Sequence, residues 1–176
     1  IESDSEIEVV AECIGGATLA YDYVKRALLA GKNVVTSNKE LVAERGQELT
    51  ALAREKGVNF LFEGAVGGGI PILRPLGQCL AANEISSVCG ILNGTTNYIL
   101  TEMITFGKSF GQALREAQEK GYAEADPTAD VEGIDAARKV CILADLCFGK
   151  NVAPADVRAA GISAITPADI ECARLI

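Results

Sequence analysis

Hydrophobic positions in the first third of the chain alternate between short apolar runs and longer stretches of helical period. The apolar runs cover residues 7–14, 33–36 and 58–62, and their length and β-branched content are typical of buried parallel strands. Residues 17–30 and 37–56 lie between them with helical spacing, and each stretch is followed by a glycine. This order predicts parallel strands joined by right-handed crossovers, as in doubly wound α/β proteins.

The pattern changes after the third predicted strand. Residues 63–71 form a glycine-rich turn that runs into a helix with a proline near its first turn. The remaining pattern predicts a strand over 84–92, helices over about 98–106, 110–120 and 131–148, and a loop-rich tail. We therefore expect an α/β chain of two domains, residues 1–70 and residues 71–176.

A polar segment follows the second predicted strand. Ser37 and Glu40 have the spacing of a capping box, with Ser37 as the N-cap. Lys39 then falls in the first helical turn, where the helix dipole disfavours a cation. Lysines occur at such surface positions at little cost. However, this segment also follows a strand's carboxyl end, where open α/β sheets bind ligands, and includes Thr36, Ser37 and Asn38.

The glycines do not form a dinucleotide-binding fingerprint. No GxGxxG follows a strand, and the glycines of residues 64–69 have a different spacing. That run is either a tight connection or a place where the backbone approaches a ligand or ion. Because the strand pattern starts as if in the middle of a Rossmann sheet, we expect a fragment whose first half-domain is missing.

Composition argues against several functional classes. A formal charge of −8 argues against a nucleic-acid partner, and no apolar run is long enough to span a membrane. The acidic N-terminus does not resemble a signal peptide, and the six cysteines include no CxxC pair, which predicts reduced core cysteines in a cytoplasmic protein. With no histidine, acid–base chemistry falls to Lys, Asp, Glu, Tyr or Cys.

Acidic side chains gather in residues 121–139, GYAEADPTADVEGIDAARK. Asp135 and Lys139 are four residues apart and so lie on one face of the predicted helix. One interpretation is an ordinary amphipathic helix with a solvated ion pair. The other is a site for a small zwitterion, because five acids this close repel one another unless a cation lies among them. These acids are Glu124, Asp126, Asp130, Glu132 and Asp135.

Four motifs, in order, resemble the homoserine dehydrogenase family over essentially the whole chain. They are AGKNVVTSNKELVA at 30–43, EGAVGGGIP at 63–71, ILNGTTNYIL at 91–100 and the acidic segment at 121–139. The resemblance implies part of a Rossmann nucleotide-binding domain followed by an α+β substrate and dimerisation domain with a mixed sheet. It also implies interconversion of L-aspartate 4-semialdehyde and L-homoserine with NAD or NADP, on the route to threonine, methionine and isoleucine.

The resemblance also assigns roles to individual residues. The implied catalytic residues are Lys39, Lys139 and Asp135. The implied substrate contacts are Thr95, Tyr122, Glu124 and Asp130. The implied cofactor contacts are Gly15, Ser37, Asn38 and Lys39. A monovalent cation such as Na⁺ would bind the carbonyls of Glu63, Val66, Gly68 and Ile70. The family further implies a homodimer. Because the fingerprint is missing, a catalytically inert dimerising fragment is the alternative.

Overall fold

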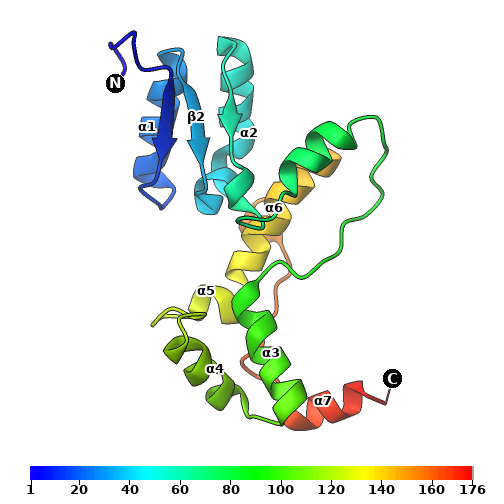
Figure 1. Ribbon diagram of the computed structural model, residues 1–176. Coiled ribbons are helices and arrows are strands. Elements are labelled where there is room, and N and C mark those ends of the chain that lie inside the picture. The colour runs from blue at the N-terminus through cyan, green and yellow to red at the C-terminus, as the bar shows by residue number, and fades with distance from the viewer. Residues whose placement is uncertain (176) are drawn as a thin grey trace. The chain divides into compact units, whose positions relative to one another are not determined.

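A computed structural model describes residues 1–175 of the chain (Figure 1). The chain divides into two compact units. The first unit consists of Ile1–Val88 and Arg138–Val157. The second unit consists of Cys89–Ala137 and the described residues from Arg158 on. The division of the sequence near residue 70 into a nucleotide-binding and a substrate domain stays a prediction.

The first unit contains a three-stranded parallel sheet. Its strands are β1 (Val9–Glu12), β2 (Asn33–Thr36) and β3 (Phe60–Leu61), in the order β1-β2-β3, and their arrows point the same way in Figure 1. Helices α1 (Thr18–Leu29) and α2 (Lys39–Lys56) form the crossovers. The predicted α/β fold with parallel strands is therefore confirmed; β2 has the predicted bounds, whereas β1 and β3 are shorter than their apolar runs.

The helices bury their apolar stripes. Ala20, Val24 and Leu28 of α1 and Leu41 and Leu49 of α2 are almost completely buried. Burial of such side chains stabilises the fold by about 1.5–3 kcal/mol for each Val or Leu. At its end, α2 stops at Gly57, which takes the left-handed conformation with a φ of 69°.

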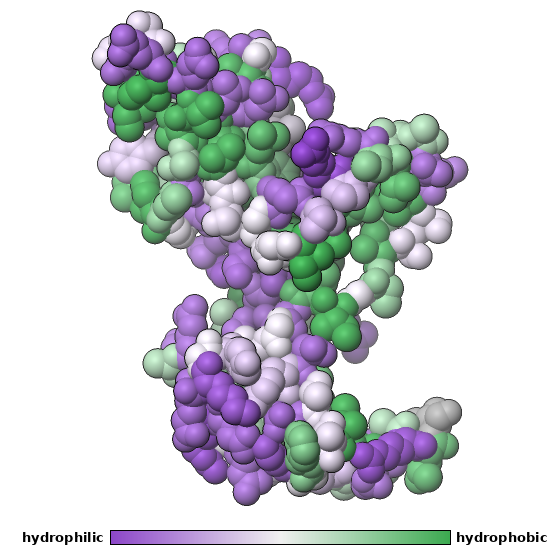
Figure 2. Space-filling view, viewed as in Figure 1, coloured by the Kyte–Doolittle hydropathy of each residue, from purple (hydrophilic) through white to green (hydrophobic). Residues whose placement is uncertain are grey.

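Strand β1 is more exposed than its apolar sequence predicts. Val9 is 56% exposed, and Ile14 beyond the strand end is also exposed. The hydrophobic surface around β1 is visible in Figure 2. The cause is topological, since β1 is an edge strand with β2 on one side only in the part of the chain that the structure describes.

The Glu63 side chain holds the segment after β3, a role that the sequence analysis did not assign to it. A short 3₁₀ helix, η1 (Glu63–Ala65), leads towards the helical turn η2 (Pro75–Cys79). The Glu63 carboxylate accepts hydrogen bonds from the backbone amides of Ile72, Leu73 and Arg74, at 2.7, 3.0 and 2.6 Å. It therefore satisfies amides that precede η2 and would otherwise lack partners.

The strand predicted over residues 84–92 is wrong. These residues form no strand, and all the strands in residues 1–175 belong to the parallel sheet of the first unit. Partial alternation marks a segment suited to pairing, but a strand forms only where a neighbour supplies its hydrogen bonds. The mixed sheet implied for the second domain consequently has no counterpart among the described strands.

The second unit is helical. Helices α3 (Gly94–Phe106) and α4 (Phe110–Glu119) pack as a hairpin around Ile99, Met103, Ala113 and Ala117. Figure 2 shows hydrophilic residues over the outer side of α4, as its amphipathic spacing predicts. The short helices η3 (Pro154–Asp156) of the first unit and α7 (Pro167–Ala173) of the second occupy the tail, and Ile170 of α7 joins the core.

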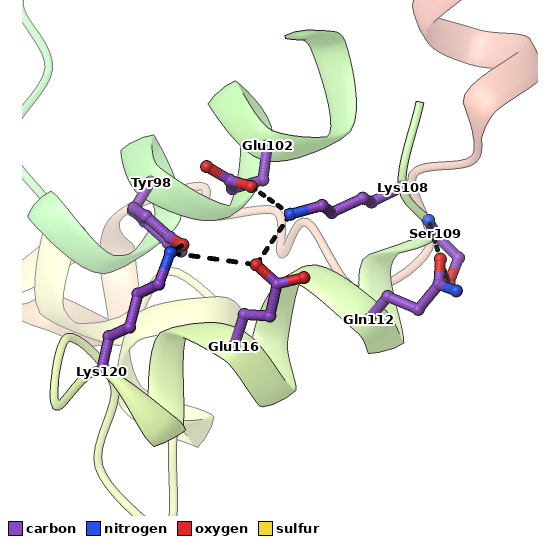
Figure 3. A network of polar contacts seen from close by, with 7 residues as sticks. All are labelled: Tyr98, Glu102, Lys108, Ser109, Gln112, Glu116 and Lys120. Carbon is purple, nitrogen blue, oxygen red and sulfur yellow. Dashed lines mark hydrogen bonds and ion pairs between the residues drawn. The ribbon is translucent and has the colours of Figure 1, made fainter. Parts of the chain in front are cut away.

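Polar contacts fasten the α3–α4 hairpin on its surface (Figure 3). Lys108 pairs with both Glu102 and Glu116, while the Lys120 ammonium donates to the Tyr98 hydroxyl at 2.8 Å. Hydrogen bonds from Lys108 to the two carboxylates raise the pKa of its ammonium. Because this lysine stays protonated at any ordinary pH, the hairpin contacts are insensitive to pH near neutrality.

The long helix predicted over 131–148 is broken. The structure has α5 (Thr128–Val131) and α6 (Ile134–Phe148), separated at Gly133, whose φ is 79°. A helix cannot continue through a left-handed residue, and a Cβ at Gly133 would lie 3.3 Å from the Ala160 carbonyl oxygen. The period of the sequence conceals this break because glycine is neutral in the apolar pattern.

The cysteines are not core residues as a group. Cys13, Cys79, Cys89 and Cys172 are exposed, whereas Cys141 is buried, and all six carry free thiols. Burial raises the pKa of the Cys141 thiol. The prediction of reduced cysteines is thus in agreement with the structure, but the prediction that they lie in the core is wrong for most of them.

Replacing Gly161 with alanine is expected to destabilise the second unit by about 2 kcal/mol, because the site has no room for a methyl group. A Cβ there would lie 2.8 Å from the Val131 carbonyl oxygen and 3.0 Å from the Glu132 Cα. Gly90→Ala is the matched control, because its Cβ would meet nothing within 4 Å. Urea unfolding would measure both, and equal stability of the two variants would contradict this packing.

Candidate active site

A pocket of about 390 Å³ lies in the first unit where β1 and β2 end. Its walls come from the turn after β1 and from the start of α2. The lining residues are Glu12, Cys13, Ile14, Gly15, Gly16, Ser37, Asn38, Lys39, Glu40 and Arg138. The predicted cofactor contacts therefore share one cavity, at the strand ends where open α/β sheets bind ligands.

The start of α2 differs in detail from the prediction. Asn38, not Ser37, is the N-cap, and its Oδ1 accepts a hydrogen bond from the Leu41 amide at 3.1 Å. Glu40 does not close a capping box but pairs with Arg138 at 3.1 Å. With the cap one residue later than predicted, Ser37 is left exposed beside the pocket and Lys39 becomes the first residue of the helix.

Glu12 is a pocket residue that the sequence analysis missed. Its carboxylate accepts hydrogen bonds from the amides of Ile14 and Gly15 and from the Thr36 hydroxyl. It was missed because it sits at the end of an apolar run, where a single acid looks like a strand terminus. The available signal was an acid three residues before two consecutive glycines.

In the second unit, two of the five acids converge on one amide. The Asn93 Nδ2 donates to Asp130 at 2.7 Å and to Asp135 at 2.9 Å, while its Oδ1 caps α3 through the Thr96 amide at 2.8 Å. Asp135 is 2% exposed. This burial excludes the interpretation of Asp135 as half of a solvated surface pair.

The remaining acids have separate surroundings. Asp126 accepts from the amide and hydroxyl of Thr128, which lowers the Asp126 pKa, and Glu132 accepts from the Ser163 hydroxyl at 2.7 Å. Glu124 is exposed. Repulsion within the acidic segment is therefore reduced in part by local hydroxyl and amide donors, and a cation is not required for these two acids.

Two predicted substrate contacts are joined to each other. The Thr95 hydroxyl, on a residue that is 8% exposed, donates to the Tyr122 carbonyl oxygen at 2.8 Å. The Tyr122 ring is exposed and lies 4.9 Å from the Tyr98 ring, centroid to centroid. Thr95 thus holds the backbone of the segment that carries Tyr122 and Glu124.

The predicted lysines both belong to the first unit and are partly buried. Lys39 starts α2 and lines the pocket, and Lys139 lies in α6, one helical turn after Asp135. The spacing on α6 places Asp135 and Lys139 on one helix face, as predicted.

The glycine-rich loop at 63–70 is a compact turn. Gly67 and Gly69 have φ values of 70° and 80°, and the Ile70 amide donates to the Gly67 carbonyl at 2.6 Å. Within residues 1–175, no group of three or more acidic, cysteine or histidine side chains could hold a metal. A site built from backbone carbonyls of this loop stays a prediction.

Comparison with known proteins decides the family. Residues 71–175 match the family model described as homoserine dehydrogenase, and residues 1–63 match the one described as homoserine dehydrogenase, NAD binding domain. The chain belongs to the homoserine dehydrogenase family. The predicted resemblance is confirmed.

Relatives and solved structures of the family match almost the whole chain. The homoserine dehydrogenase of Pseudomonas aeruginosa is 51% identical over 98% of the chain and 40% of its own length. The crystal structure of a homoserine dehydrogenase from Thiobacillus denitrificans is 48% identical, with a TM-score of 0.94, covering 99% of this chain and 41% of that one. A hyperthermophilic archaeal homoserine dehydrogenase mutant in complex with NADPH is 33% identical, with a TM-score of 0.81, covering 92% and 50%.

The chain spans about 40% of the length of the curated relatives it matches. None of the helices in residues 1–175 is both long and apolar enough to cross a membrane.

Proposed function

We propose that this chain carries the nicotinamide-binding and catalytic groups of a homoserine dehydrogenase, which interconverts L-aspartate 4-semialdehyde and L-homoserine. The observation that carries the proposal is the pocket at the ends of β1 and β2, within a chain that belongs to this family. The reaction moves a hydride and a proton, so the protein must bind a nicotinamide cofactor, hold the amino-acid end of the substrate and manage one proton.

NAD or NADP is the cofactor that the pocket suits. Asn38 and Ser37 offer short polar side chains beside Gly15 and Gly16, where a Cβ would meet nothing within 4 Å. Such open backbone accepts a flat ring or a ribose at close range. When bound, the cofactor supplies or accepts the hydride. The pocket residues bind and orient it.

Acidic side chains of the second unit are proposed to hold the substrate. Glu124 and Asp130 would pair with its ammonium group, and the exposed Tyr122 ring would lie beside them. Thr95 would contribute through the backbone of Tyr122, since its hydroxyl already donates there. Holding the amino-acid end orients the reacting carbon, which is a large part of the rate enhancement in such reactions.

Lys139 is proposed to move the proton. It would donate to the developing alkoxide during reduction and remove the hydroxyl proton during oxidation. Asp135 would orient it from the preceding turn of α6, and Lys39 would add electrostatic and relay support from the start of α2. A lysine can serve as acid and base near neutral pH where a neighbouring cation or desolvation lowers its pKa.

Further family properties are part of the proposal. The carbonyls of Glu63, Val66, Gly68 and Ile70 would bind a monovalent cation such as Na⁺, and a homodimer would form in the cytoplasm. The product would serve threonine, methionine and isoleucine synthesis. These features rest on membership of the family.

Two measurements test the function. The protein encoded by the complete reading frame should reduce NADP⁺ or NAD⁺ only when homoserine is present, followed by nicotinamide absorbance. Titration of the 176-residue chain with NADPH, followed by nicotinamide fluorescence, separates a binding chain from an inert dimerising fragment. A complete protein with no homoserine-dependent reduction would overturn the proposal.

A further inference from the structure

Glu12 is a buried acid in an unusual position. It ends β1, is 5% exposed and lines the pocket. Buried carboxylates are costly unless hydrogen bonds satisfy them. Here Oε1 accepts from the amides of Ile14 and Gly15 at 2.7 and 3.1 Å, and Oε2 accepts from the Thr36 hydroxyl at 2.6 Å.

The hydrogen bonds continue from Glu12 to the second wall of the pocket. The Thr36 Oγ1 accepts from the Asn38 amide at 2.9 Å. The Asn38 Nδ2 then donates to the Gly16 carbonyl at 2.7 Å. These hydrogen bonds form a closed network that joins the turn after β1, residues 13–16, to the N-cap of α2.

The turn at residues 13–16 has little else to hold it. Gly15 and Gly16 both adopt left-handed conformations, with φ values of 81° and 69°, and both are exposed. Glycine loses more conformational freedom on ordering than any other residue. Two amides anchored on one carboxylate therefore set the path of a segment that would otherwise sample many conformations.

The negative charge of Glu12 strengthens the hydrogen bonds that anchor this turn. Burial alone would raise its pKa, but the hydrogen bonds from Thr36, the Gly15 and Ile14 amides and Asn38 outweigh burial, and the net pKa is lowered. The carboxylate is ionised at neutral pH. Hydrogen bonds to an ionised acceptor are about twice as strong as those between neutral groups.

We infer that Glu12 is a positioning residue for the cofactor pocket, holding the 13–16 turn and the N-cap of α2 in the geometry that binds the nicotinamide half of the cofactor. It acts through Thr36, Asn38 and the turn backbone and does not contact the substrate. The inference rests on the proposed function, which makes this pocket the cofactor site. A pocket ordered before binding gains affinity because the ligand need not order it.

Kinetics of the protein encoded by the complete reading frame test this role. Glu12→Gln removes the charge, and Thr36→Val removes the hydroxyl while keeping the shape of the side chain. Each is expected to raise the KM for NADP⁺ about tenfold and leave the KM for homoserine within about twofold. Thr36→Ser, which keeps the hydroxyl, and Glu8→Gln, at an exposed acid just before β1, should match the wild type.

A second readout needs no cofactor. In the 176-residue chain, hydrogen exchange at the Ile14 and Gly15 amides should be faster in Glu12→Gln than in Glu8→Gln, with the rest of the sheet unchanged. This measurement separates local release of the turn from global unfolding, which would speed exchange throughout β2 as well.

The outcomes are distinct. An unchanged KM for NADP⁺ in both Glu12→Gln and Thr36→Val, with wild-type turnover present, would overturn the role of Glu12 alone. An equal rise in both KM values would also overturn it, since that pattern indicates general damage. Absence of homoserine-dependent reduction in the wild type would overturn the proposed function itself.

Discussion

Replacing Lys139 with alanine is expected to lower turnover by about 10²–10⁴-fold, the usual contribution of a positioned acid or base. If Lys139 is the proposed acid and base, the alanine variant of the protein encoded by the complete reading frame should still bind cofactor and homoserine but lack the group that exchanges the hydroxyl proton. The rate of homoserine-dependent NADP⁺ reduction at saturating substrate measures this directly. The KM for NADP⁺ should change little, because Lys139 is not among the residues that line the pocket.

Two further variants sharpen the test. Lys139→Arg keeps the positive charge but cannot give up a proton at ordinary pH, so it should be nearly as slow as alanine if proton transfer is the role. Lys150→Ala, at an exposed lysine just beyond α6, controls for loss of a cation from this region. Turnover near the wild-type rate in Lys139→Ala would refute the assignment, and wild-type turnover in Lys139→Arg would limit the role to electrostatics.

Replacing Asn93 with alanine is expected to destabilise the 176-residue chain by about 3 kcal/mol. Loss of the α3 cap costs about 1 kcal/mol, and removing a donor from a buried carboxylate costs about 1.5–3 kcal/mol. Both losses occur together here, because one side chain caps the helix and donates to Asp130 and the buried Asp135. Urea unfolding followed by circular dichroism would give the change in unfolding free energy.

Asn97→Ala is the matched control for Asn93→Ala, since Asn97 is an exposed asparagine in the same helix. Its stability should stay near that of the wild type. Asn93→Asp separates the two roles of Asn93, because it keeps the capping oxygen but replaces the amide donor with a third carboxylate. It should remain strongly destabilised at neutral pH. A loss below about 1 kcal/mol in Asn93→Ala would show that capping alone accounts for Asn93.

Local rules were sufficient for the first unit. The apolar runs, the helical spacing and the glycine stop at Gly57 depend on neighbours within a few residues, and helices between successive strands then predict parallel pairing. The same rules placed Asn38 and Lys39 at a strand's carboxyl end, so the location of the pocket was predictable. The exposure of β1 was not, because apolar sequence does not distinguish an edge strand from a central one.

The features that the sequence analysis predicted wrongly or missed depend on residues far away along the chain. The segment at 84–92 has strand-like alternation but no described strand beside it, and at the Gly133 break a residue with a Cβ would lie against the Ala160 carbonyl oxygen, 27 residues further along the chain. Glu12 and Asn93 also have partners close in sequence, but the contacts that make them organising residues are distant: Thr36 lies 24 residues from Glu12, and Asp130 and Asp135 lie 37 and 42 residues from Asn93. Pattern and propensity carry no information about such distant donors and acceptors.

By itself, the sequence determined the α/β class, the parallel pairing of the first strands, the family and the residue types available for chemistry in a chain without histidine. These follow from period, spacing and motif, which are properties of the linear chain. Only the tertiary structure decided that Asp135 is buried, that Asn93 joins two acids and that Glu12 ties the two turns of the pocket together. Burial and hydrogen bonding depend on which distant atoms meet, and that is settled when the chain packs.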